Sequence, residues 1–180
     1  MKTLTLLRHA KSGWDDQGVR DFDRRLNPKG KRAARLMGRH MRDSGVAWDH
    51  AIASPAARVV ETLNEVAEGY GRAIEPVWDR RVYLASAATL LDLVQSTADD
   101  HGGLLLSGHN PGLEDLILTL VADIPDNPLR DAVEAKFPTC SMAVTTAEVD
   151  RWADFTPRAI TLTKFVRPRD LDPGLGPDAD

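Results

Sequence analysis

The sequence has 180 residues, 42% of them hydrophobic, a formal net charge of -4 and a single cysteine, Cys140. This length suits one domain with a sizeable core, and one cysteine can form neither an internal disulfide nor, by itself, a zinc site. The acidic balance gives nucleic-acid binding no electrostatic support. No apolar stretch approaches the ~18 residues that cross a bilayer, and Arg8 and His9 interrupt the N-terminal apolar run before it resembles a signal peptide. We therefore expect a cytoplasmic protein that binds neither nucleic acid nor membranes.

The first predicted elements form a strand-helix-strand unit. Residues 3–7 are a short, β-prone apolar run that ends at a charged pair, as a buried strand does at the edge of a sheet. After a polar loop, Asn27 and Pro28 supply the cap and first position of a helix, whose apolar residues recur every four positions until Gly45. Residues 51–53 predict the second strand.

The same alternation continues along the chain. Ser54 and Pro55 repeat the cap-and-proline start and predict a second amphipathic helix. A strand near residues 74–78, a helix at about 86–97 and a leucine-rich strand at 104–106 follow.

In the last third of the sequence, the spacing of apolar residues changes from that of helices to that of strands. Residues 110–111 start another helix, and a proline-rich loop leads to residue 138. Two strand-like runs follow at residues 142–149 and 160–166. Proline and glycine in the tail predict that residues 172–180 are disordered.

Strands that alternate with helices predict a three-layer α/β/α fold with a mainly parallel central sheet, in a single domain over residues 1–171. Such sheets bind ligands at the carboxyl ends of their strands. Arg8 and His9 follow the first strand, Arg58 follows the second, and His109 follows the leucine-rich strand. Together with helix N-termini they predict a strongly positive pocket, and guanidinium forks and free backbone N–H groups suit a phosphoryl group.

Three ordered motifs carry a family resemblance. Residues 4–15 (LTLLRHAKSGWD), 54–62 (SPAARVVET) and 107–114 (SGHNPGLE) are similar to the three signature segments of the phosphoglycerate mutase-like histidine phosphatase superfamily. The short chain and its end, FVRPRDL at residues 165–171, resemble the SixA-type phosphohistidine phosphatases. The resemblance implies a phosphoglycerate mutase-like fold.

The resemblance also implies a mechanism that needs no metal and no cofactor. His9 would be the nucleophile and would be transiently phosphorylated, while Arg8, Arg58 and His109 would hold the phosphoryl oxygens. The substrate would be phosphorylated, and a phosphohistidine protein or a small phosphate ester both fit. A nucleophilic imidazole divides hydrolysis into two phosphoryl transfers, with charge stabilisation as the other main contribution.

The substrate contacts and the general acid are less well specified. Ser12, Asp15 and Asn110 are assigned to substrate binding. Relatives carry a glutamate near the position that Arg80 occupies here, so Asp15 and Asp79 are the only acids to test for protonation of the leaving group.

Alternative functions remain open at this point. A phosphoryl-binding module without turnover would retain the pocket, and a mutase would need more substrate-enclosing insertions than this chain offers. A metal-dependent hydrolase is disfavoured because neither His9 nor His109 has a metal-ligand partner at local spacing.

Two other features have simple structural interpretations. We interpret Cys140 as a small buried hydrophobe. A solvated helix face is the simplest interpretation of one run of basic residues: Arg20, Arg24, Arg25, Lys29, Lys31, Arg32 and Arg35.

Overall fold

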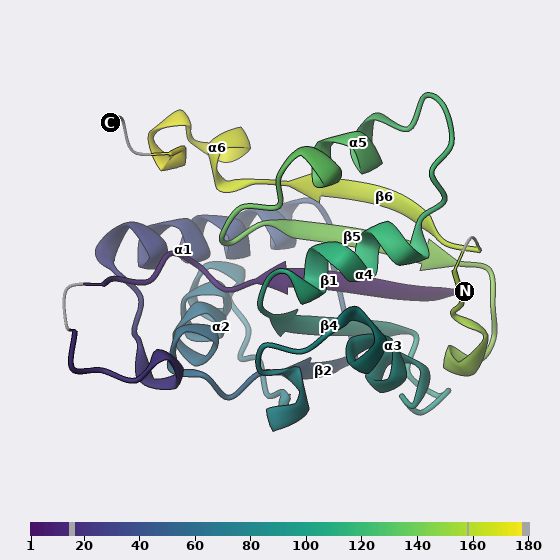
Figure 1. Ribbon diagram of the computed structural model, residues 1–180, viewed down its shortest axis with the longest axis horizontal. Helices are drawn as coiled ribbons and strands as arrows, with labels where there is room; N and C mark the ends of the chain where they lie inside the picture. The colour runs from purple at the N-terminus through teal and green to yellow at the C-terminus, as the bar shows by residue number, and fades with distance from the viewer. Residues whose placement is uncertain (15–16, 158, 178–180) are drawn as a thin grey trace.

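The computed structural model of the protein describes residues 1–14, 17–157 and 159–177. Its six-stranded sheet has the order β3-β2-β4-β1-β5-β6 (Figure 1). The strands are β1 Lys2–Arg8, β2 His50–Ala53, β3 Val77–Trp78, β4 Gly103–Gly108, β5 Met142–Ala147 and β6 Thr161–Val166. The pairs β1·β4, β2·β4 and β2·β3 are parallel, whereas β5 runs antiparallel to both β1 and β6. The predicted mainly parallel α/β fold is confirmed.

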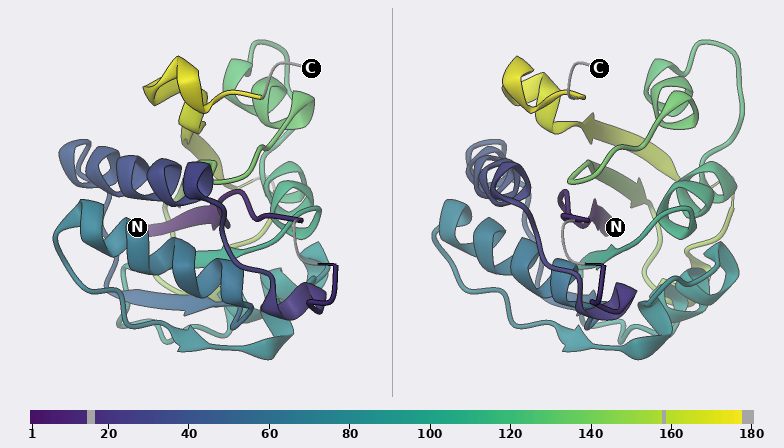
Figure 2. Two further views of the ribbon diagram at one scale, coloured as in Figure 1. Left: turned by 90° about the vertical axis from the view of Figure 1, so that its left-hand side faces the viewer. Right: turned by 60° about the vertical axis from the view of Figure 1, so that its left-hand side comes forward.

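Helices cover both faces of the sheet, with α1 and α2 on one side and α3, α4 and α5 on the other (Figure 2). The α-helices are α1 Pro28–Asp43, α2 Ala57–Tyr70, α3 Ala87–Gln95, α4 Gly112–Leu120, α5 Pro128–Ala135 and α6 Pro168–Leu171. Short 3-10 turns are η1 Asp21–Asp23, η2 Arg80–Val82, η3 Trp152–Asp154 and η4 Pro173–Leu175. Among the described residues, no helix is both long and apolar enough to span a membrane.

Side-chain alternation along the strands divides the core in two. Leu104 and Leu106 face the α3, α4 and α5 side, while Leu105 between them faces α1 and α2. All three are fully buried, as expected when both faces of a sheet are covered. Each layer therefore stabilises the sheet by removing a separate set of apolar side chains from water.

The start of α1 fixes the loop that follows β1. The Asn27 side chain caps the helix by accepting from the Gly30 N–H at 2.8 Å, and the Asn27 N–H donates to the Lys11 carbonyl at 3.0 Å. A Cβ on Gly30 would lie 2.2 Å from that same carbonyl oxygen. Only glycine lets the helix approach the loop so closely, so α1 holds residues 10–12 in place.

Three local predictions need correction. The second helix starts at Ala57 rather than after Ser54, whose hydroxyl turns toward His109 instead of capping the helix. The predicted loop before residue 138 contains α5, which Asn127 caps by accepting from the Arg130 N–H. Residues 172–177 belong to the tail that was predicted to be disordered, but they have a defined fold. The turn η4 forms there, and Leu175 is buried against the α1 side of the core.

Candidate active site

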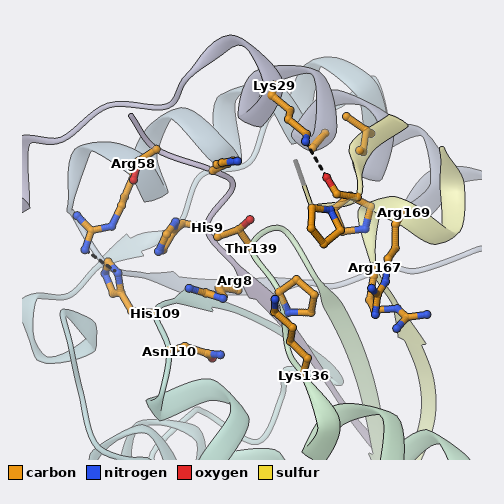
Figure 3. A pocket seen from close by; sticks show the side chains of 18 of the residues that line it. Arg8, His9, Lys29, Arg58, His109, Asn110, Lys136, Thr139, Arg167 and Arg169 are labelled. Carbon is orange, nitrogen blue, oxygen red and sulfur yellow. Dashed lines mark hydrogen bonds between the residues drawn. The ribbon is translucent and has the colours of Figure 1, made fainter. Parts of the chain in front are cut away.

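The structure brings Arg8, His9, Arg58 and His109 together at the carboxyl edge of the sheet (Figure 3). Arg8 ends β1 and lies opposite Gly108 at the end of β4, so the residues that follow the two strands are neighbours. The His9 N–H donates to the Gly108 carbonyl at 3.1 Å, and the centroids of the His9 and His109 rings are 5.3 Å apart. Parallel pairing of the two strands thus places both imidazoles in one cleft.

His9 is held as a neutral imidazole with a defined tautomer. Its Nδ1 lies 2.7 Å from the Ala10 carbonyl oxygen, which can only accept, so Nδ1 carries the proton. Burial lowers the pKa of His9 to about 3 although the hydrogen bond to the Ala10 carbonyl raises it, and the charges of Arg8 and Arg58 act in the same direction as burial. The remaining nitrogen, Nε2, therefore keeps its lone pair at neutral pH, as a nucleophile requires.

The backbone around His9 is tied to its neighbours. The Ala10 N–H donates to the Thr62 hydroxyl at 2.9 Å, and that hydroxyl donates to the Arg58 carbonyl at 2.6 Å. On the other side the Cys140 N–H donates to the His9 carbonyl at 2.9 Å. These bonds connect the loop after β1 with α2 and with the start of β5, which limits the freedom of the imidazole.

His109 is also neutral in this site. Arg58 Nη2, which can only donate, lies 3.3 Å from His109 Nδ1, so the proton lies on Nε2, 2.7 Å from the Ser54 hydroxyl. Burial and the charge of Arg58 lower the pKa of His109 to about 3. In the absence of a bound anion, the two positive charges near His9 therefore belong to Arg8 and Arg58 and not to His109.

A carboxylate that the sequence analysis missed, Asp21 of η1, orients Arg58. Arg58 donates to the Asp21 carbonyl at 2.6 Å and to its carboxylate at 3.0 Å, and the Tyr83 hydroxyl donates to the same carboxylate oxygen. Burial alone would raise the pKa of Asp21, but the hydrogen bonds from Tyr83 and Arg58 and the charge of Arg58 lower it to about 2. Asp21 is thus an ionised anchor rather than a proton donor.

Both arginines retain donors that no described residue accepts. Arg8 uses Nη1 to donate to the Phe137 carbonyl at 2.9 Å, while its buried Nε has no partner. The buried Nε of Arg58 also has none among the described residues. Buried donors are nearly always paired in folded proteins. Unpaired guanidinium donors beside two neutral imidazoles are the arrangement expected of a site that binds an anion.

Comparisons with known proteins agree with this geometry. Residues 4–81 match the model of the histidine phosphatase superfamily (branch 1). An uncharacterized protein of Mycobacterium tuberculosis is 32% identical over 164 residues, which cover 91% of this chain and 100% of the relative. The chain belongs to the histidine phosphatase superfamily.

Solved structures place the chain among the SixA-like histidine phosphatases. The SixA protein from Agrobacterium tumefaciens is 29% identical, with a TM-score of 0.77 over 93% of this chain and 98% of its own. The SixA protein from Nakamurella multipartita is also 29% identical, with a TM-score of 0.80 over 93% and 96% of the two chains. The predicted resemblance is confirmed, and with it the phosphatase class of the enzyme.

The predicted substrate contacts of this histidine phosphatase have different outcomes. Ser12 and Asn110 line the cleft, although each already bonds to protein groups: Ser12 accepts from Arg24 at 2.8 Å, and Asn110 donates to the Phe137 carbonyl at 3.0 Å. Asp15 lies outside the described residues. Asp79 pairs with Arg81 at 2.7 Å and does not line the cleft.

The histidine phosphatase cleft has a volume of about 610 Å³ and a strongly basic lining. Among its described lining residues, Asp21 is the only carboxylate. The cationic side chains there are Arg8, Lys11, Arg24, Lys29, Arg58, Lys136, Arg167 and Arg169. Arg24 and Lys29 belong to the run that was interpreted as a solvated helix face, and this interpretation is wrong for those two.

Two further predictions concern metals and Cys140. The described part of the chain contains no group of three His, Cys, Asp or Glu side chains that could hold a metal ion. Cys140 is fully buried, and burial raises the pKa of its thiol to about 12. Its interpretation as a small buried hydrophobe is confirmed, because such a thiol does not ionise at neutral pH.

Proposed function

We propose that this phosphatase hydrolyses phosphohistidine in a protein substrate through a phosphorylated His9, without a metal ion. The observation that carries the proposal is a buried, neutral His9 whose Nε2 keeps its lone pair. Its cleft also holds Arg8 and Arg58, whose buried Nε donors have no hydrogen-bond partner among the described residues. The two SixA proteins carry the provisional designation phosphohistidine phosphatase, which supports the same substrate class.

The reaction proceeds in two balanced transfers. His9 Nε2 attacks phosphorus and the bond from phosphorus to the substrate nitrogen breaks. That nitrogen keeps the electron pair, and the substrate ring, which is protonated on its other nitrogen, leaves as neutral imidazole. Water then attacks the phosphorus on His9 and releases inorganic phosphate, which restores the neutral imidazole. Arg8 and Arg58 stabilise the phosphoryl oxygens in both steps, and the Ala10 carbonyl stabilises the positive ring of phospho-His9 through Nδ1–H.

His109 assists once the substrate is bound. A phosphoryl dianion beside its ring opposes the effect of Arg58 and raises the pKa of His109 from its low value in the empty site. His109 can then donate a charge-assisted hydrogen bond to a phosphoryl oxygen. The negative charge of the bound phosphoryl group thus favours the protonated form of His109 that donates to it.

The shortage of proton donors in the cleft favours hydrolysis of a phosphorus-nitrogen bond over hydrolysis of a phosphate ester. Among the described residues that line the cleft, Asp21 is the only carboxylate, and its low pKa keeps it ionised. An alkoxide needs a proton as it leaves, and a placed acid typically contributes ~10²–10⁴ in rate. A protonated imidazole leaves as a neutral base, so phosphohistidine depends less on such an acid.

The rim of the cleft suits a macromolecular substrate. Trp14 is 74% exposed and Leu84 is 57% exposed, and both line the cleft. Large apolar side chains exposed beside a site commonly mark contacts with another protein. Such contacts would position a phosphohistidine side chain over His9.

Two synthetic peptides of the same sequence test the proposal, one with phosphohistidine and one with phosphoserine at the same position. In the presence of excess EDTA, we expect kcat/KM for phosphohistidine to exceed that for phosphoserine by about 10² or more, since the ester lacks its acid. Equal or faster cleavage of phosphoserine would contradict the proposal and indicate a general acid and an ester substrate. Release of no phosphate from any substrate would favour a binding module, and activity restored by a metal would favour the metal-dependent alternative.

A further inference from the structure

The cleft has a second basic region away from the catalytic histidines. Figure 3 shows Arg167 and Arg169 on one side of the pocket and Arg58 and His109 on the other. The Lys136 side chain extends toward the middle of the pocket, between these two sides. Lys136 follows α5, and Arg169 lies in α6. The region is therefore built from the C-terminal part of the fold, whereas Arg58 and the loop after β1 come from the N-terminal part.

The cations of this region differ in how they are paired. Arg167 forms an ion pair with Asp170 at 2.8 Å, and Lys29 donates to the Gly176 carbonyl at 2.7 Å. Lys136 and Arg169 make no side-chain hydrogen bond and no ion pair with any described residue, although Asp170 lies within electrostatic reach of Arg169. The Nε of Arg169 is buried without a partner. We call Lys136 and Arg169 the distal pair.

The backbone that carries Arg169 is firmly anchored. The Asp170 carboxylate accepts from the Arg167 backbone N–H at 2.8 Å and from the Arg167 guanidinium, and Pro168 at the first position of α6 is buried. The bond from Lys29 to Gly176 ties the chain after α6 to α1, and Leu175 between them is buried. A rigid support for an unpaired guanidinium reduces the entropy that binding a ligand would cost.

We propose that the distal pair binds an acidic side chain of the substrate protein, so that the enzyme prefers phosphohistidines with an Asp or Glu nearby. This inference rests on the proposed function, because the distal pair and His9 line one cleft and would contact one substrate. The fork of Arg169 matches a carboxylate with two parallel hydrogen bonds, and the exposed Lys136 adds a second positive charge.

The test uses two phosphohistidine peptides that differ only in neighbouring residues, Glu in one and Gln in the other. For the wild-type protein, we expect kcat/KM to favour the Glu peptide by about tenfold, as for a hydrogen bond between charged groups. In the variant Lys136→Met with Arg169→Met, this ratio falls to about one. Arg169→Lys alone keeps the charge but loses the fork, and we expect an intermediate ratio.

A matched control changes the same charges elsewhere. Lys31 and Arg32 are exposed on α1 and do not line the cleft, so Lys31→Met with Arg32→Met should keep the tenfold ratio. Thermal unfolding of each variant shows whether it is folded. A wild-type ratio near one, or a high ratio that survives in the distal double variant, would overturn the inference while the proposed function stands. If wild-type protein hydrolyses an aryl phosphate but neither peptide, the proposed function itself fails.

Discussion

At the residue scale, catalysis depends on which atoms carry protons. The Ala10 carbonyl assigns the proton of His9 to Nδ1 and leaves Nε2 with the lone pair that the proposed nucleophile needs, whereas Arg58 assigns the proton of His109 to Nε2. Arg58 is itself held by Asp21, which lies far from it in sequence. These side chains form one chain of contacts, so a change at Asp21 acts on the reaction through Arg58 and His109.

Removal of Arg58 tests this chain of contacts. We expect Arg58→Ala to reduce kcat/KM by about 10²–10³, as for loss of a strong donor to the transition state. Asp21→Asn should have a smaller effect of the same sign, mainly on kcat, because Arg58 then loses its ionic partner but keeps its own charge. Arg25→Ala is the matched control, since Arg25 pairs with Glu61 on the surface. Steady-state kinetics with an aryl phosphate measure all three, and a fully active Arg58→Ala would contradict the assigned role.

At the element scale, periodic patterns predicted most strands and helices, because both faces of the sheet are buried and apolar spacing follows from that burial. The same patterns located His9 and His109, which directly follow strands. They could not locate Asp21, because η1 is a polar turn whose position depends on tertiary contacts with Arg58 and Tyr83.

One helix start signal lies inside the segment predicted to be a loop. Asn127 and Pro128 repeat the start signal of residues 27–28 and begin α5. Lys136 directly after this helix lines the cleft. The tail gave no such signal: the burial of Leu175 and the bond from Lys29 to Gly176 are long-range contacts that composition alone does not reveal.

At the scale of the whole molecule, an acidic protein concentrates cations in one cleft. Burial, together with the charges of the arginines in this cleft, keeps His9 and His109 neutral. Their pKa values of about 3 in the folded protein lie well below the ordinary value of about 6.5 in an unfolded chain. As the pH falls below about 6.5, the unfolded state therefore takes up protons that the folded state does not, and stability decreases.

Urea unfolding between pH 7 and pH 4 measures this linkage. We expect the free energy of unfolding to fall with decreasing pH by at most ~1.4 kcal/mol per pH unit for each of the two histidines. The double variant His9→Asn with His109→Asn should show a shallower slope. His50, whose pKa burial also lowers, contributes equally to both proteins. Equal slopes in the wild type and the variant would show that the two imidazoles are not held neutral by the fold.

The proposed mechanism requires that His9 is transiently phosphorylated. Brief incubation with a substrate carrying labelled phosphate, followed by denaturation in alkali, should trap one label per chain that is stable to base and labile to acid, as expected for a phosphorus-nitrogen bond. Peptide mapping should place this label on His9, and His9→Ala should abolish both label and turnover, while Cys140→Ala should retain both. Normal turnover by His9→Ala, or label mapped to another residue, would contradict the mechanism.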